Sequence, residues 1–486
     1  MQLTFGSTNI GIGVMQDNLA LYFPRDDFEK LRGPDWPSYE NFLSGDRGPN
    51  AEIEQEINNF VQMFRKDGIK FPIRTATACQ SKWTWSTIYL NQLSTASCHR
   101  VDPVPLDLGR FDNFHNLPKK LQDRRLMLEG KWPTGGCEYC RDIEAVGGHS
   151  DRLHNLEIRN LTPPELEHDQ TAISVTPRIV EIFAQNTCNF SCVYCNAHLS
   201  SQIEAENRKH GDFNQGGVRI PIMSVPAPAR QTFDRFMLWL SNNVGSLKRL
   251  HLLGGETFLQ HDLMHGVLSI LENHPSPDLE LCIFSNMNAP DRLWQKYTQQ
   301  IKDLQQQGHI KVFDLTASID CWGDAAEYTR QGLDLGKFEN NFAWAADQDP
   351  AWLRLNINQT VTAMTIKSMP ELIDKITKYS YNRHIGHYFQ FYTGPQMFQH
   401  PKIFAYDFWR QDFERIYRAM PTNTLEQQEA IPRMQGLDRL LQQSQQHDWA
   451  AIQQLHILLT ELDRRRGTNW QQTFPYLNIK PEDIHD

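Results

Sequence analysis

The sequence predicts an α/β fold with a parallel sheet, and two observations in residues 177–400 lead to this prediction. Short segments rich in β-branched and aromatic residues alternate with longer segments whose apolar residues recur at helical spacing. Six strand-like segments take part in this alternation, which is the pattern of βαβ units with parallel strands. Because βαβ crossovers are right-handed, we expect the six strands to form an open, partial (β/α)6 barrel of the TIM type.

The expected elements follow one another in a regular order. The predicted strands are 177–183, 248–253, 279–284, 312–319, 353–361 and 387–392. The predicted helices between them are 232–242, 261–272, 291–307, 338–346 and 370–379. Ligands of such barrels bind on the loops that follow the carboxyl ends of the strands, so we look for functional residues there.

The chain on either side of the barrel region divides into further parts, as its 486 residues require. Residues 1–70 are an unassigned, loop-rich N-terminal extension with helical spacing at 51–66. Residues 71–160 contain a strand-like segment at 83–90 and four cysteines, and a linker follows them. Residues 401–486 are expected to be a helical C-terminal region.

Composition and charge restrict the class of protein. The net charge of −10 argues against a general nucleic-acid binder, which needs a basic surface. We see no signal peptide and no apolar run of membrane-spanning length, so we expect a soluble cytoplasmic protein without a membrane partner. In a reducing compartment its clustered cysteines indicate metal binding before disulfides.

Three cysteines directly after the first predicted strand form a C-x₃-C-x₂-C pattern: Cys188, Cys192 and Cys195. Three thiolates on one loop can hold three irons of a 4Fe–4S cluster, since cysteine is the usual ligand of such clusters. The fourth iron would then be open to a small molecule. A zinc site or three unrelated thiols are the alternatives.

Four more cysteines lie nearer the N-terminus: Cys79, Cys98, Cys137 and Cys140. The first pair flanks the predicted strand and its expected hairpin, and the second pair is a C-x₂-C. Four thiolates in two pairs suit tetrahedral zinc as well as an iron–sulfur cluster, and the residues alone leave both open.

Polar or glycine-rich motifs end four of the other strands. Gly254-Gly255-Glu256 ends the second strand, where glycine permits a close backbone approach and the acid can accept bonds from an ammonium group. The further candidates at strand ends are Asn286, Ser318, Asp320, Arg330, Asn356 and Asn358. Ser318 and Asp320 alternate onto one face of their strand. A surface ion pair is the alternative for Arg330.

These motifs, in this order, resemble the radical S-adenosylmethionine (radical SAM) superfamily over residues 79–392. The resemblance implies that Cys188, Cys192 and Cys195 hold a 4Fe–4S cluster whose open iron binds S-adenosylmethionine (SAM). It also implies that Gly254, Gly255 and Glu256 hold the SAM amine. The resemblance further assigns SAM contacts to Asn286, Ser318, Asp320, Arg330 and Asn356, with the ribose hydroxyls on Ser318 and Asp320 and the SAM carboxylate on Arg330.

The hairpin with one cysteine pair, followed by a C-x₂-C, resembles the "twitch" auxiliary-cluster domain of radical SAM enzymes. The flanking residues that share this resemblance are Arg125, Met127, Gly130, Pro133, Glu144, Gly147, Gly148, Ser150 and Arg152. It implies a second, auxiliary 4Fe–4S cluster on Cys79, Cys98, Cys137 and Cys140. Asn91-Gln92-Leu93-Ser94 stands where the family usually has a glycine in the hairpin turn.

Three further features bear on activity. A polar Gly/Pro-containing insertion at 204–230 follows the cysteine loop and is expected to cover the active site or contact substrate. Cys321 follows Asp320 directly and is either a substrate-facing thiol or a packed loop cysteine. Enzymes with twitch-like domains often modify peptides, so the resemblance implies a peptide substrate, with a small metabolite second, and an electron donor such as flavodoxin or ferredoxin.

Overall fold

The protein is represented by a computed structural model, which describes residues 2–5, 8–15, 18–22, 72–73, 75–145, 150–158, 161–227, 230–380, 383–420 and 425–481. The helix expected at 51–66 and the glycines Gly147 and Gly148 lie outside the described residues. The chain forms two compact units. The first contains Met1–Ile88, Ser94–Val180 and Ser246–Lys248, and the second contains Tyr89–Leu93, Glu181–Gly245 and Arg249–Asp486.

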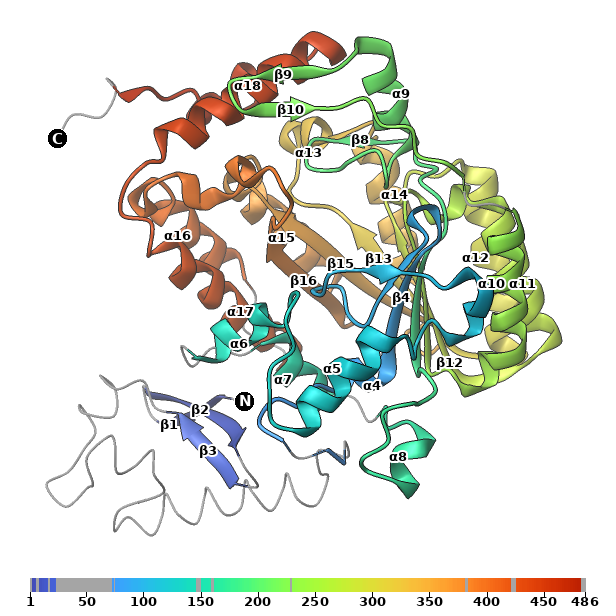
Figure 1. Cartoon of the computed structure of the whole chain (residues 1–486). Helices are drawn as coiled ribbons and strands as arrows, with labels where there is room; N and C mark the ends of the chain where they lie inside the picture. Colours follow the sequence, from blue (N-terminus) through green and yellow to red (C-terminus); the bar gives the residue numbers. More distant parts are fainter. Residues whose placement is uncertain are drawn as a thin grey trace, which may run out of the picture. The chain divides into compact units, whose positions relative to one another are not determined.

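A large parallel sheet forms the centre of the second unit (Figure 1). Its parallel strands are β11 (Arg249–Leu253), β12 (Ser276–Ser285), β13 (Ile310–Ser318), β15 (Leu353–Val361) and β16 (Ile385–Phe391), paired in this order. The strand β7 (Ile179–Phe183), which enters this unit at Glu181, lies next to β11. The predicted α/β fold with parallel strands is therefore confirmed.

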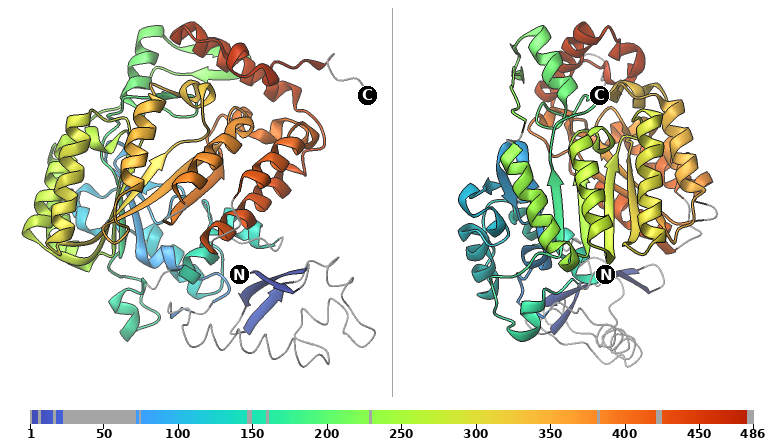
Figure 2. Two further views of the ribbon diagram at one scale, coloured as in Figure 1. Left: turned by 180° about the vertical axis from the view of Figure 1, so that it is seen from behind. Right: turned by 90° about the vertical axis from the view of Figure 1, so that its right-hand side faces the viewer.

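Helices join successive strands, as βαβ crossovers require. They are α10 (Arg230–Asn243), α11 (His261–Asn273), α12 (Asp291–Gln306), α14 (Leu335–Ala346) and α15 (Met369–Tyr379). Figure 2 shows α10, α11 and α12 side by side along one face of the sheet. The buried residues of α12 recur at helical spacing, at Trp294, Tyr297, Ile301 and Leu304, so one stripe of the helix packs against the sheet.

Polar side chains of the parallel strands form a buried network. The Arg249 guanidinium donates from Nη2 to Asp314 Oδ2 at 2.8 Å and to Cys282 Sγ at 2.8 Å. Asn356 Nδ2 donates to Asp314 Oδ1 at 2.5 Å. Asn356 is therefore engaged in the middle of its strand, whereas Asn358 lies level with Ser318 in the register.

The C-terminal part of the second unit is largely helical. Its helices are α16 (Arg410–Ala419), α17 (Leu425–Leu441), α18 (Trp449–Arg466) and α19 (Trp470–Thr473). Tyr328 OH donates to Asp463 Oδ1 at 2.8 Å, which ties α18 to the segment that follows β13. None of the helices in the described part of the chain is both long enough and apolar enough to pass through a membrane.

The insertion expected at 204–230 is partly regular structure. It contains the end of α9 (Ser201–His210) and a hairpin of β9 (Phe213–Gln215) and β10 (Val218–Ile220). A Cβ atom on Gly216 would lie 2.3 Å from Ile457 Cδ1, so the hairpin turn packs directly on α18. The Arg466 guanidinium holds the Glu206 carboxylate of α9 with bonds of 2.9 and 3.1 Å. Figure 1 shows α18 running beside β9 and β10.

The first unit contains short helices and strands around its own core. The elements are β1 (Gln2–Phe5), β2 (Thr8–Met15), β3 (Asn18–Tyr22), α4 (Gln80–Thr84), β4 (Trp85–Tyr89), β5 (Ser94–Ala96), β6 (Val104–Pro105), α5 (Pro118–Leu128), α6 (Glu138–Ala145), α7 (Asp151–Ile158) and α8 (Pro164–His168). The strand expected at 83–90 begins two residues later, because Gln80–Thr84 form a helical turn that Thr84 closes by donating from Oγ1 to Gln80 O at 3.0 Å.

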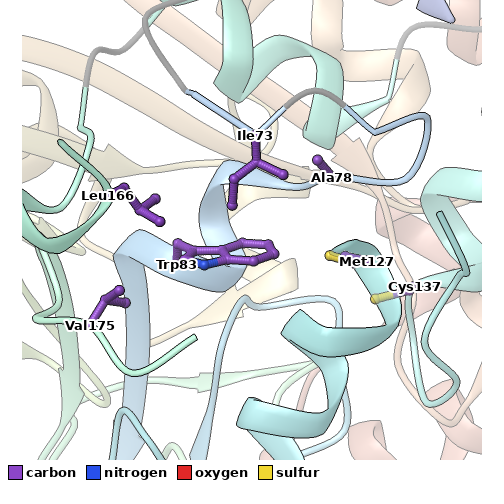
Figure 3. Close-up of a cluster of buried hydrophobic side chains, with 7 residues drawn as sticks. All are labelled: Ile73, Ala78, Trp83, Met127, Cys137, Leu166 and Val175. Atoms are coloured by element: carbon purple, nitrogen blue, oxygen red, sulfur yellow. The ribbon is translucent and has the colours of Figure 1, made fainter. Parts of the chain in front are cut away.

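A buried tryptophan organises the core of the first unit (Figure 3). Trp83 has no exposed surface and packs with the apolar side chains of Ile73, Ala78, Met127, Cys137, Leu166 and Val175. Its indole Nε1 donates to Ala172 O at 2.8 Å, which satisfies the one polar atom of the ring. Of the candidate ligands, Cys137 belongs to this cluster and Cys79 packs against it.

Candidate active site

The cysteine loop, residues 185–195, leaves the end of β7 and is held by hydrogen bonds to its neighbours. The backbone N–H of Cys188 donates to Ser201 Oγ at 3.1 Å, and that hydroxyl donates to Cys188 O at 3.2 Å. The amide of Asn189 accepts from Asn286 Nδ2 at 2.8 Å. The start of α9, at Ser201, and Asn286, directly after the end of β12, therefore hold the half of the loop that carries Cys188.

The three thiols of this loop lie near enough to influence one another. Burial, followed by the charge of Cys192, raises the pKa of Cys188 above its usual range. The same two causes raise the pKa of Cys195 to about 12. Thiols in such surroundings become thiolates only with a compensating cation, and three sulfur donors on one loop have the chemistry of an iron–sulfur site. Among the described residues, no three His, Cys, Asp or Glu side chains stand in a ready-made metal-binding arrangement.

The glycines after β11 pack directly against the cysteine loop. Gly254 and Gly255 have φ angles of 88° and 52°, a region that suits glycine. A Cβ atom on Gly255 would lie 2.1 Å from Thr187 O, and Glu256 N donates to that same oxygen at 2.8 Å. The glycine pair therefore allows the close approach that the sequence predicted, and here its partner is the backbone next to Cys188.

The Glu256 side chain is fully buried and joins the ends of β11 and β12. Its carboxylate accepts from Asn286 N at 2.6 Å, from Ser285 Oγ at 2.9 Å and from Phe258 N at 3.1 Å. Burial raises the pKa of Glu256 to about 7. The three hydrogen bonds act in the opposite direction, but their effect is smaller than that of burial. Glu256 and Asn286, both predicted site residues, are thus brought together beside the cysteine loop.

This raised pKa gives a pH dependence of stability. In the unfolded chain the group has its ordinary value of 4.5, so the folded chain keeps a proton that the unfolded chain has lost. Its stabilising contribution is complete below the unfolded pKa and is lost as the pH rises towards 7. Between about pH 5 and pH 7 we expect the metal-free protein to lose up to about 1.4 kcal/mol per pH unit relative to Glu256→Gln. Denaturant unfolding of both proteins across this range measures the difference, and parallel curves would contradict it.

Asp320 and Arg330 form a buried ion pair after β13. Arg330 donates to the Asp320 carboxylate from Nε at 2.9 Å and from Nη2 at 3.1 Å. Tyr194, which stands between Cys192 and Cys195, donates from its hydroxyl to Asp320 Oδ2 at 2.7 Å. Sequence reasoning missed Tyr194, although its place inside the C-x₂-C was a usable signal.

The other two candidates after β13 differ in exposure. Ser318 is half-buried at the end of the strand, opposite Asn358. Cys321 has no exposed surface, and burial raises the pKa of its thiol well above the ordinary value. Ser318 is therefore partly exposed, whereas Cys321 is packed inside the protein.

The four cysteines of the first unit share one electrostatic environment. Burial and then the charge of Cys79 raise the pKa of Cys140 to about 12, and the same causes raise that of Cys98 above its usual range. Burial raises the pKa of Cys137 as well, against the nearby Lys82 ammonium, which lowers it. The charge of Cys79 thus acts on the pKa of each of the other three cysteines.

Two buried cations accompany these thiols. Lys82 is 2% exposed and pairs with Asp123 at 2.7 Å. The Arg152 guanidinium holds Glu144 with bonds of 2.9 and 2.5 Å and donates to Ala78 O, next to Cys79, at 2.8 Å. Glu144 and Arg152, noted in the sequence for their spacing, therefore fix the backbone beside a candidate ligand.

Comparisons with known proteins found weak similarities to solved structures. No family model matches the chain, and no curated protein matches it. Among solved structures, the crystal structure of SuiB from Streptococcus suis, bound to S-adenosylmethionine, aligns with a TM-score of 0.33 and 12% sequence identity. The alignment covers 66% of this chain and 64%, just under two thirds, of that one.

Proposed function

We propose that this protein is a radical SAM enzyme. The observation that carries the proposal is the direct packing of a three-cysteine loop on the Gly254-Gly255 turn, with Glu256 N bonded to the backbone beside Cys188. Such packing brings the loop that carries these cysteines to the end of β11, and ligands of α/β proteins bind at such strand ends. In keeping with this, the six parallel strands would form a partial barrel.

Each part of the site has a proposed role. Cys188, Cys192 and Cys195 would hold a 4Fe–4S cluster, which supplies the electron that cleaves SAM to a 5′-deoxyadenosyl radical able to abstract a substrate hydrogen. The backbone at Gly254 and Gly255 and the side chain of Ser318 would bind and orient SAM. The Glu256 N–H holds the turn on the cysteine loop at Thr187 O, and its buried carboxylate joins the ends of β11 and β12, so these strand ends would stay in place around the ligand.

The first unit would carry a second thiolate-bound centre. Cys79, Cys98, Cys137 and Cys140 would hold an auxiliary 4Fe–4S cluster, and the buried Lys82 ammonium beside Cys137 suits a negatively charged centre. Zinc fits the same four donors. The corresponding domains would be 71–160 for this centre, 177–400 for the barrel and 401–486 for the helical region, with a peptide as substrate and a flavodoxin or ferredoxin as electron donor.

A direct assay tests the enzyme proposal. The protein is reconstituted anaerobically with iron and sulfide and incubated with SAM and dithionite, and 5′-deoxyadenosine is measured by chromatography. We expect 5′-deoxyadenosine to form, and iron at both thiol sites. One zinc per chain in place of the auxiliary iron would exclude electron transfer through the first unit.

The alternative is a non-catalytic iron–sulfur or zinc protein, such as a redox carrier. The observation in its favour is that Asp320 and Arg330, two of the predicted SAM contacts, are bonded to one another. A cluster that is present by absorption and electron paramagnetic resonance, with no 5′-deoxyadenosine formed, would support the carrier and exclude the enzyme.

A further inference from the structure

We propose that Tyr194, Asp320 and Arg330 form a latch that fixes the second half of the cysteine loop to the end of β13. In this role they are positioning residues for Cys192 and Cys195, and they do not contact SAM. The inference rests on the proposed function for its meaning, because it concerns the loop that would hold the cluster.

The Asp320 carboxylate has no acceptor position left for a ligand. Its Oδ2 accepts from Tyr194 OH at 2.7 Å and from Arg330 Nε at 2.9 Å. Its Oδ1 accepts from Arg330 Nη2 at 3.1 Å and from Thr360 N at 2.8 Å. A carboxylate offers about four acceptor positions, so these four bonds fill it. Asp320 is also 1% exposed, so ribose hydroxyls would have to displace an existing partner.

Arg330 is joined to the cysteine loop by its backbone as well as by its side chain. The short strands β8 (Ser191–Cys192) and β14 (Arg330–Gln331) pair antiparallel, with Arg330 opposite Cys192. Val193 N donates to Thr329 O at 2.9 Å. A Cβ atom on Gly332 would lie 2.8 Å from Asn189 O, so the chain after Arg330 also lies against the loop.

Tyr194 completes the latch from the side of the loop. It lies between Cys192 and Cys195, so anchoring its hydroxyl fixes the backbone that carries both thiols. The Arg330 guanidinium stands 5.7 Å from the centre of its ring, a distance that suits a cation–π contact. A hydrogen bond to a charged group contributes more to stability than one between neutral groups. Removing the Tyr194 hydroxyl therefore loosens this segment and leaves the Asp320–Arg330 ion pair intact.

The test uses Tyr194→Phe in the full-length protein, with Tyr417→Phe as the matched control. Tyr417 donates to the buried Asp438 at 2.8 Å, so the control removes the same kind of bond from the C-terminal helices. In the metal-free protein, alkylation of Cys192 and Cys195 is followed by mass spectrometry. We expect Tyr194→Phe to speed it about tenfold, and the control to leave it unchanged, because a bond to a charged group is worth about 1.5 kcal/mol or more.

The second measurement uses the reconstituted protein. We expect Tyr194→Phe to retain less iron than the wild type, while the dissociation constant for SAM, measured on the iron-loaded fraction, stays the same. Unchanged alkylation and iron content would overturn the latch. A normal iron content with weakened SAM binding in Asp320→Asn would overturn it too, because it would make Asp320 a SAM contact. The alkylation result needs no SAM cleavage, so failure of the proposed function would be recognised separately.

Discussion

We expect the replacement of Cys188 with alanine to abolish the formation of 5′-deoxyadenosine, and the replacement of Cys137 to leave part of it. Cys188 is one of three donors on the loop that would bring iron to SAM, so two thiols remain where three are required. Cys137 lies in the first unit beside Lys82, and its loss affects the auxiliary centre alone. Both variants are reconstituted anaerobically, and 5′-deoxyadenosine and substrate-derived product are measured separately.

The comparison of these two variants tests whether one set of cysteines serves SAM cleavage and the other set an auxiliary centre. We expect Cys137→Ala to cleave SAM without a matching amount of product, which is uncoupled turnover. Equal behaviour of the two variants, whether both are inactive or both active, would contradict the assignment of one set of cysteines to SAM and the other to an auxiliary role. Iron analysis of each variant identifies which site has been emptied.

Gly255→Ala is expected to destabilise the protein by about 4 kcal/mol and to empty the cysteine loop of iron, because it places a methyl group into a backbone carbonyl. The new Cβ would lie 2.1 Å from Thr187 O and 2.7 Å from Thr187 C, and no side chain can move aside to relieve the overlap. The Gly254-Gly255 turn would have to leave the loop, and the bond from Glu256 N to Thr187 O would be lost. Denaturant unfolding of the metal-free protein and iron content after reconstitution measure the two effects.

Gly308→Ala is the matched control for this prediction. Gly308 also has a positive φ angle, 75°, and a Cβ atom there would meet nothing within 4 Å. Its replacement isolates the cost of the left-handed backbone, about 1–2 kcal/mol, without a collision. Similar losses of stability and equal iron contents in the two variants would show that the approach to Thr187 is unimportant.

The sheet could be predicted from the sequence because its signal is local. The strands β11, β12, β13 and β15 are largely apolar segments between helices of clear periodicity, so strand and helix types follow from neighbouring residues alone. The boundary at Trp83 was wrong by two residues, because a hydrogen bond from Thr84 to Gln80 closes a helical turn where the aromatic residues favour a strand. Glycine chemistry predicted a close approach of the Gly254-Gly255 backbone to a ligand, which stays a prediction, whereas the packing of this turn on Thr187 was not foreseen.

The partners of the charged site residues could not be predicted, because they come from distant parts of the chain. Tyr194 and Asp320 are 126 residues apart, and Asn286 and Glu256 are joined across two strands. Sequence spacing indicates that a carboxylate stands at a strand end, but it does not indicate how many acceptor positions the protein itself fills. Ser318 remains a candidate SAM contact, whereas the acceptor positions of the Asp320 carboxylate are occupied by hydrogen bonds from neighbouring residues.

The bond between Arg466 and Glu206 joins residues 260 positions apart. Translation proceeds from the N-terminus, so the ribosome finishes α9 long before it makes α18. Until then the helix that follows the cysteine loop lacks the ion pair that holds it. The surroundings of the loop that carries Cys188, Cys192 and Cys195 are thus completed only after α18 has been made and has packed on α9.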